Sequence, residues 1–220
     1  MGRLFLLLTL LSGLWGEEPE GFPLRYLDLM EEPRQVFLSR EKPEECLELS
    51  LAPEILWGGA MAHPSVPAAC KRTFVTTKGS LQPIRAAEGV ETYGEVEVLE
   101  FLRDKAGPEP ERYILVDSRS AKWYETRTIP GAVNMLVNLS PPDKPTLDGA
   151  LRKLGVKIRF GAYDFREAKT ALLFCNGPWC AQSRLTILAL LSIGYPPEKL
   201  KWYRGGLQDW LAAGLTSVVP

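Results

Sequence analysis

Two cysteines five positions apart, Cys175 and Cys180, carry the side chains best suited to chemistry in this chain. Cys175 follows the short apolar run 171–174, which is long enough for a buried strand but too short for a helix. The three residues after Cys175 favour a sharp turn. A deprotonated thiol is a nucleophile, so we expect Cys175 to be the reactive group.

A helix is expected directly after this turn. From about Ala181 to Ile193 the sequence is apolar nearly all round, and Gly194 is typical of a helix end. The free N–H groups and the positive dipole end of this helix would point into the cysteine loop. The physics that binds phosphate at helix N-termini would therefore stabilise a Cys175 thiolate.

Strands and helices alternate over the second half of the chain. We expect strands at 113–116, 132–133, 171–174 and 200–203, and helices at 95–105, 121–126, 147–154, 181–193 and 207–213. Further short strands are expected at 34–38 and 74–77, and residues 157–169 are ambiguous. This alternation predicts a parallel sheet covered on both faces, with a ligand site at the carboxyl ends of its strands. Cys175, Asp117 and Arg204 all follow strands and are expected to lie near one another.

The second cysteine has two interpretations that the sequence leaves open. Cys180 could attack a persulfide or disulfide of Cys175 and resolve it, or it could be a small apolar residue at the helix start. The only histidine, His63, gives poor support to Cys–His protease chemistry. Four residues separate the two cysteines, an odd spacing for zinc, so we expect no metal and no cofactor. A phosphatase-type loop would need arginine where Ala181 stands.

Four segments, taken in order, resemble the rhodanese family of sulfurtransferases. They are Ile114-Leu-Val-Asp-Ser-Arg119, Thr128-Ile-Pro-Gly-Ala-Val-Asn134, the Cys-Asn-Gly-Pro-Trp-Cys loop of residues 175–180, and Tyr203-Arg-Gly-Gly-Leu-Gln-Asp-Trp210. Thr128 stands where the family usually has histidine. The resemblance covers residues 113–215, more weakly 73–105, and nothing before Cys70.

This resemblance implies an α/β fold with a five-stranded parallel sheet and helices on both faces. It implies that Cys175 takes sulfane sulfur from a small donor such as thiosulfate or a polysulfide, holds it as a persulfide, and passes it to a thiol, to cyanide or to a redox protein. The residues expected to form the loop and bind substrate are Asn176, Gly177, Trp179, Ser183, Arg184 and Arg204. Asp117 and Arg119 are expected to form an internal, structural pair.

Two other functions remain open at this point. One is a thiol–disulfide oxidoreductase that uses Cys175 and Cys180. The other is an inactive member of the family that serves as a binding module, because a fold does not fix a function.

The N-terminus predicts export. Arg3 precedes the apolar run 4–15, which is shorter than the roughly 20 residues of a membrane-spanning helix and fits a signal peptide. An uncleaved anchor is the alternative. We expect residues 1–16 to be removed, no stable membrane insertion, and a secreted or periplasmic protein. Residues 17–69 would then form a small N-terminal extension, and residues 70–220 the rhodanese-like domain.

The charge of the chain bears on its partners, and its cysteine content bears on disulfide pairing. The 220 residues include 26 basic and 27 acidic side chains without a basic block, so nucleic acid is not an expected partner. Export favours cysteine pairing. We expect a structural disulfide between Cys46 and Cys70, and a pair at Cys175 and Cys180 that is redox-active or free.

Overall fold

The computed structural model describes residues 20–41, 44–47, 63–68, 79–137 and 144–220. The predicted signal peptide, the strand expected at 74–77 and Cys70 lie outside these residues, so the Cys46–Cys70 disulfide stays a prediction. Within the described ranges, no helix is long and apolar enough to span a bilayer.

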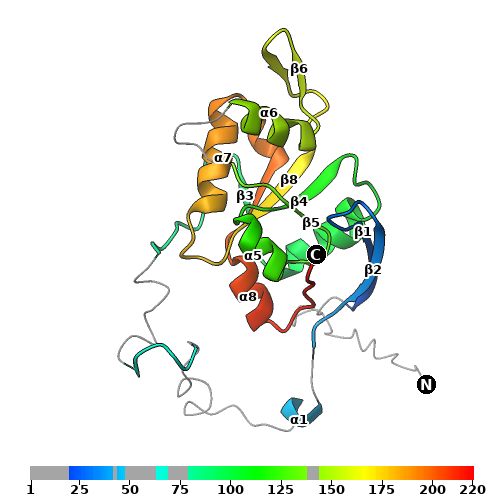
Figure 1. Cartoon of the computed structure of the whole chain (residues 1–220), viewed down its shortest axis with the longest axis vertical. Coiled ribbons are helices and arrows are strands. Elements are labelled where there is room, and N and C mark those ends of the chain that lie inside the picture. Colours follow the sequence, from blue (N-terminus) through cyan, green and yellow to red (C-terminus); the bar gives the residue numbers. More distant parts are fainter. Residues whose placement is uncertain (1–19, 42–43, 48–62, 69–78, 138–143) are drawn as a thin grey trace, which may run out of the picture.

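A five-stranded parallel sheet forms the centre of the molecule, in the order β3-β9-β8-β4-β5 (Figure 1). Its strands are β3 (Glu91–Tyr93), β4 (Tyr113–Asp117), β5 (Ala132–Asn134), β8 (Thr170–Phe174) and β9 (Leu200–Tyr203). The apolar run that precedes Cys175 is the central strand β8, paired with β4 on one side and β9 on the other. The predicted α/β class and five-stranded sheet are confirmed.

Helices pack on both faces of this sheet. They are α4 (Glu95–Phe101), continued by the π-helical turn Leu102–Ala106, α5 (Ala121–Thr126), α6 (Lys144–Lys153), α7 (Gln182–Ser192) and α8 (Gly206–Ala212). A 3₁₀ turn, Pro197–Lys199, leads into β9. Side chains of β8 alternate between two buried clusters, as a strand requires. Leu173 packs with residues of α6 and α7, whereas Leu172 packs with residues of α4 and α8.

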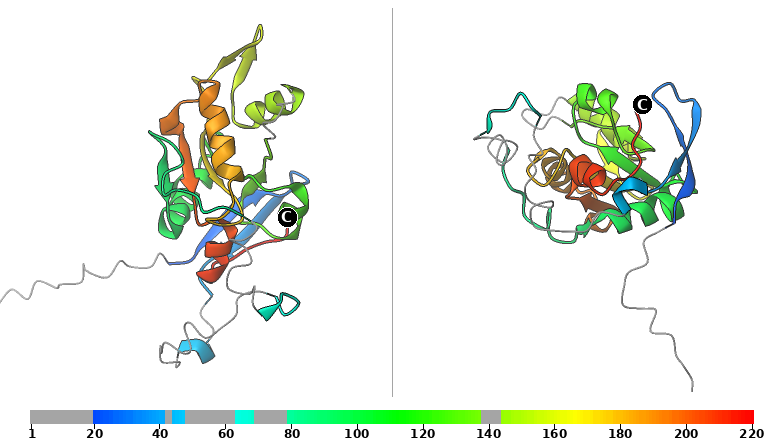
Figure 2. Two further views of the ribbon diagram at one scale, coloured as in Figure 1. Left: turned by 90° about the vertical axis from the view of Figure 1, so that its left-hand side faces the viewer. Right: turned by 90° about the horizontal axis from the view of Figure 1, so that it is seen from below.

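The ambiguous residues 157–169 form an antiparallel hairpin of β6 (Lys157–Arg159) and β7 (Ala162–Asp164). Its two turn residues, Phe160 and Gly161, both have positive φ, 50° and 80°. Such a turn matches the twist of a two-residue hairpin. Figure 2 shows this hairpin projecting away from the central sheet. Its strands are short and mostly polar, so they lack the apolar periodicity from which a strand is predicted.

A second hairpin, β1 (Phe22–Leu27) and β2 (Pro33–Leu38), belongs to the predicted N-terminal extension. It is followed by the single turn α1 (Glu44–Leu47). Leu24 and Leu38 are 3% and 0% exposed, in the cluster that also contains α4 and α8 residues. This part of the extension therefore completes the core of the main domain.

Truncation of a hairpin leucine measures how much this packing contributes. We predict that Leu38→Ala lowers the free energy of unfolding by about 2–5 kcal/mol, because it leaves a cavity in the shared core. Urea denaturation followed by tryptophan fluorescence measures the change. Leu27→Ala is the matched control, since Leu27 is 61% exposed, and we expect a change within about 0.5 kcal/mol. Equal effects of the two substitutions would show that the hairpin is not part of the core.

Candidate active site

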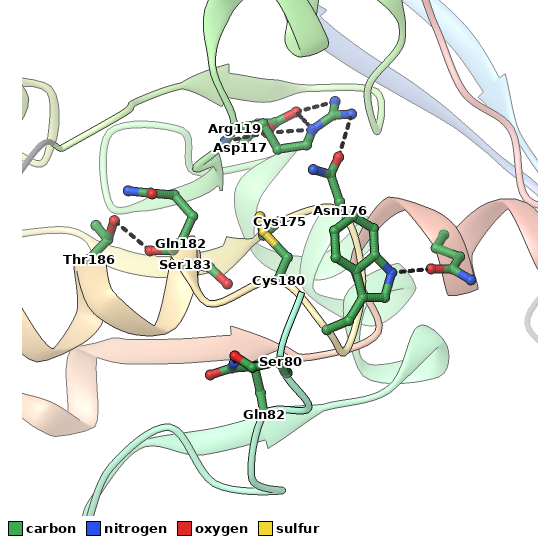
Figure 3. The surroundings of a disulfide bond; sticks show 12 residues. Ser80, Gln82, Asp117, Arg119, Cys175, Asn176, Cys180, Gln182, Ser183 and Thr186 are labelled. Carbon is green, nitrogen blue, oxygen red and sulfur yellow. Dashed lines mark hydrogen bonds and ion pairs between the residues drawn. A yellow bond between two sulfur atoms is a disulfide. The ribbon is translucent and has the colours of Figure 1, made fainter. Parts of the chain in front are cut away.

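Cys175 follows directly after β8 and is joined to Cys180 by a disulfide bond, with 6.1 Å between their Cα atoms (Figure 3). Cys175 is 2% exposed, whereas Cys180 is half-buried. Helix α7 begins two residues after Cys180, close to the predicted start. The two thiols are therefore paired and not free in this structure, and Cys180 does more than fill space. Whether the pair is redox-active stays a prediction.

The start of α8 holds the first part of the cysteine loop by its backbone. The N–H of Leu207 donates to the carbonyl of Cys175 at 2.9 Å. The N–H of Gln208 donates to the carbonyl of Asn176 at 2.8 Å. Gly206 makes this approach possible: its φ is +62°, and a Cβ there would lie 2.4 Å from the Cys175 carbonyl oxygen. Only glycine fits a position with both constraints.

Residues 79–86, which we call the strap, hold the second part of the loop. The N–H of Ser80 donates to the carbonyl of Trp179 at 3.0 Å, and the N–H of Gln82 donates to the carbonyl of Pro178 at 2.9 Å. Figure 3 shows Ser80 and Gln82 beside Cys180. The strap thus binds two consecutive carbonyls of the loop through its backbone N–H groups.

Two arginines predicted to bind substrate hold the strap. The Arg204 Nε and Nη2 atoms donate to the carbonyl of Gln82 at 3.1 and 2.9 Å. Arg184 Nε donates to the carbonyl of Ala86 at 3.1 Å. The hydrogen bonds that the structure gives these guanidiniums therefore go to the strap. A direct role of Arg184 or Arg204 toward a substrate stays a prediction.

Several backbone N–H groups of the cysteine loop have no acceptor among the described residues. Its five successive carbonyls, from Cys175 to Trp179, all accept hydrogen bonds, the Gly177 carbonyl from the N–H of Cys180 at 2.9 Å. In the part of the chain that the structure describes, the N–H groups of Asn176, Gly177 and Trp179 have no acceptor. Successive free N–H groups of a tight loop favour an anion. This arrangement can stabilise a thiolate or a persulfide anion on Cys175.

The side chain of Trp179 is fixed by α8. Its Nε1 atom donates to the side-chain Oε1 of Gln208 at 2.5 Å (Figure 3). The same Nε1 atom would lie 2.9 Å from a Cβ on Gly177, so a larger residue there would require the Trp179 and Gln208 side chains to shift. Gln208 thus binds the loop through both its backbone and its side chain.

Asp117 and Arg119, expected as an internal pair, lie at the end of the neighbouring strand β4 and are 0% and 3% exposed. Arg119 Nη2 donates to Asp117 Oδ2 at 2.6 Å. The hydroxyl of Thr128, which replaces the family's usual histidine, donates to the same oxygen at 2.7 Å. Arg119 Nη1 reaches the side-chain oxygen of Asn176 at 3.5 Å (Figure 3). This buried cluster therefore borders the cysteine loop and contacts it through Asn176.

Ser183, also predicted to bind substrate, lies in the interior. It is 1% exposed, and its hydroxyl accepts a hydrogen bond from Trp202 Nε1 at 3.0 Å. Ser183 therefore links α7 to β9 and does not present its hydroxyl at the surface.

The pKa of one carboxyl at the start of α8 is shifted. Burial raises the pKa of Asp209, and the neighbouring Glu95 raises it further, while Arg204 opposes both effects. Asp209 lies in the first turn of α8, directly after Leu207 and Gln208, whose N–H groups bind the cysteine loop. Among the described residues, no group of His, Cys, Asp and Glu side chains could hold a metal ion.

The sequence did not predict the roles of the strap and of Gln208. Their main contacts with the loop use backbone N–H groups, which leave no pattern in the side chains. The glycine at 206 was the available signal, because it marks a place where two backbones approach closely.

The match to a family model and the similar solved structures agree with each other. The family model described as Rhodanese-like domain matches residues 99–213, more than half of the chain. A rhodanese-related protein from Thermoplasma volcanium is 15% identical, with a TM-score of 0.40 over 59% of this chain and 99% of that chain. A single-domain sulfurtransferase from Saccharomyces cerevisiae is 21% identical, with a TM-score of 0.37 over 57% and 91% of the two chains. No curated protein matches the chain.

Substitution of Gly206 tests the backbone contact between α8 and the loop. We predict that Gly206→Ala lowers the free energy of unfolding by about 1–3 kcal/mol, since alanine is strained at positive φ and its Cβ would meet the Cys175 carbonyl. Urea denaturation measures the change. Gly149→Ala is the control, because that helical glycine has no atom within 4 Å of an added Cβ, and we expect it to be neutral or stabilising by up to about 1 kcal/mol. A neutral Gly206→Ala would contradict the contact as described.

Proposed function

The chain belongs to the rhodanese-like domain family, and we propose that it is a sulfurtransferase that carries sulfane sulfur on Cys175. The observation that supports this most directly is the backbone of the cysteine loop. The carbonyls from Cys175 to Trp179 all accept backbone hydrogen bonds, four of them from α8 and the strap, and three N–H groups of the loop have no acceptor among the residues that the structure describes. A loop of this kind favours an anionic sulfur, which sulfur transfer needs before and after the first step.

The first step forms a persulfide. The Cys175 thiolate attacks the outer sulfur of thiosulfate, the sulfur–sulfur bond of the donor breaks, and sulfite leaves with its electron pair. The charge is conserved, because the thiolate becomes a persulfide anion and the dianionic thiosulfate becomes dianionic sulfite. A polysulfide donor would react in the same way, with a shorter polysulfide as the leaving group. The free loop N–H groups and the positive end of α7 stabilise the anion on both sides of this step.

The second step regenerates the free Cys175 thiolate. A thiolate or cyanide attacks the outer sulfur of the persulfide, and Cys175 leaves as a thiolate, so that the acceptor becomes a persulfide or thiocyanate. Before the cycle starts, the Cys175–Cys180 disulfide must be reduced, because a disulfide sulfur is not a nucleophile.

Export is part of the same proposal. It rests on the apolar run after Arg3 and on the acidic residues that follow Gly16. The disulfide between Cys175 and Cys180 adds support, because such bonds persist mainly in oxidising compartments. Mass spectrometry of the protein recovered outside the cytoplasm should show Glu17 as its first residue, and an intact Met1 there would contradict the proposal.

Incubation with thiosulfate tests the main step. We predict that protein first reduced with dithiothreitol and then freed of it gains the mass of one sulfur atom, located on Cys175 by peptide mapping. Cys175→Ser should gain none. The unreduced protein should also gain none, since its Cys175 is bonded to Cys180. Absence of an adduct on the reduced protein with both thiosulfate and polysulfide would overturn the proposal.

A second candidate function is favoured by the disulfide itself. Cys175 and Cys180 could act as a dithiol–disulfide pair that exchanges electrons with other thiols.

Cys180→Ala separates the two functions. For a sulfurtransferase, we predict that this variant still forms the Cys175 persulfide, because Cys180 takes no part in that step. For an oxidoreductase, turnover of a disulfide substrate such as oxidised glutathione should fall to background. The wild-type protein, assayed with both substrates, shows which of the two activities is present to be lost.

A further inference from the structure

The two cysteines of the disulfide differ in how far each residue is exposed to solvent. Cys175 is 2% exposed, whereas Cys180 is half-buried. An external thiolate must approach one sulfur along the line of the sulfur–sulfur bond, and the greater exposure of Cys180 favours attack at its sulfur. Attack there releases Cys175 as the leaving thiolate, and the free N–H groups of the loop stabilise it. The greater exposure of Cys180 and the better leaving-group character of Cys175 thus favour the same reaction, attack on Cys180 with release of Cys175.

The strap, which binds the cysteine loop, also carries exposed apolar side chains. Leu81 is 71% exposed and Ile84 is 70% exposed. Leu81 lies between Ser80 and Gln82, the two residues whose N–H groups bind the carbonyls of the cysteine loop. Arg204 and Arg184 hold the strap at Gln82 and Ala86, on either side of Ile84. The two apolar side chains are therefore carried by a backbone that is fixed at several points.

We propose that Leu81 and Ile84 form a docking surface for a dithiol protein that reduces the Cys175–Cys180 disulfide by attack on Cys180. The proposal rests on the proposed function, since sulfur transfer needs Cys175 as a free thiolate. Single exposed apolar residues are common on protein surfaces. Two of them on the short segment that binds the cysteine loop favour a protein partner, because its interface buries apolar area. A small thiol would gain little from them.

The exchange is balanced in two steps. A thiolate of the partner attacks Cys180 Sγ, forms a mixed disulfide, and releases Cys175 as a thiolate. The partner's second thiolate then attacks its own sulfur in the mixed disulfide and releases Cys180. Two electrons pass from the partner to this chain, so the partner becomes a disulfide and Cys175 and Cys180 become thiols, with the protons supplied by the partner's two thiols.

Reduction kinetics test the surface. Thioredoxin serves as the probe dithiol protein and dithiothreitol as the small dithiol, with the oxidised full chain as substrate. We expect the double variant Leu81→Ser, Ile84→Ser to be reduced by thioredoxin about tenfold more slowly than wild type, as for truncation of interface anchors, and by dithiothreitol at an unchanged rate. The matched control is Leu29→Ser, Met30→Ser, whose side chains are 52% and 80% exposed in the β1–β2 turn, and it should react as wild type.

Three outcomes would overturn the docking surface. They are no reduction by thioredoxin, an unchanged rate for the strap variant, and an equal slowing with both reductants, which would mean that the substitutions alter the cysteine loop itself.

A trapping experiment tests the direction of attack. A thioredoxin variant that lacks its second active-site cysteine stops at the mixed disulfide with the oxidised chain. Peptide mapping should place the bond on Cys180, and a bond on Cys175 would overturn the proposed direction. Persulfide formation by protein reduced with dithiothreitol needs no docking partner. If the docking fails while that adduct still forms, the proposed function stands without this partner, and the reverse result leaves the reductase surface without sulfur transfer.

Discussion

The cysteine loop depends on where its carbonyls point. Five consecutive carbonyls, from Cys175 to Trp179, are taken up by hydrogen bonds, two of them to the start of α8 and two to the strap. A carbonyl that turned inward would bring a partial negative charge toward the sulfur and disfavour an anion there. Because every one of these carbonyls is bound, four of them by surrounding segments and one by the N–H of Cys180, the loop N–H groups are the backbone groups that remain available to the sulfur among the described residues. The electrostatics of the site thus follow from backbone geometry and need no cationic side chain in contact with the sulfur.

The segments that bind the loop come from distant parts of the sequence. Helix α8 follows β9, the strand next to β8, and the strap precedes β3, the edge strand on the other side of β9. The buried Asp117–Arg119 pair approaches from β4 and reaches the loop through Asn176. Breaking a buried pair of this kind leaves an uncompensated charge in the interior, so its members constrain each other strongly. The position of the loop is therefore a property of the whole sheet and not of a local motif.

The sequence predicted the elements that are apolar and periodic, and missed those that are fixed by turns and backbone contacts. Strands β4, β8 and β9 and helices α5 and α7 were predicted within a residue or two, because burial on a sheet demands apolar side chains at regular spacing. The hairpin β6–β7 was not, because its strands are polar and its form is set by Phe160 and Gly161 at positive φ. At the site, the sequence drew attention to Cys175 and Cys180, which the structure joins in a disulfide, and the reactivity of Cys175 stays a prediction. The sequence could not reveal the strap, or that Ser183 is buried against Trp202, because these depend on tertiary contacts.

The strap joins the cysteine loop through its main chain and leaves the side chains at Leu81 and Ile84 uninvolved in that attachment. Substitutions at these two positions can therefore accumulate without moving the reactive sulfur. Under the proposed docking, the side chains that would bind a partner differ from the backbone groups that hold the loop, so partner preference could change over evolutionary time without altering the cysteine loop.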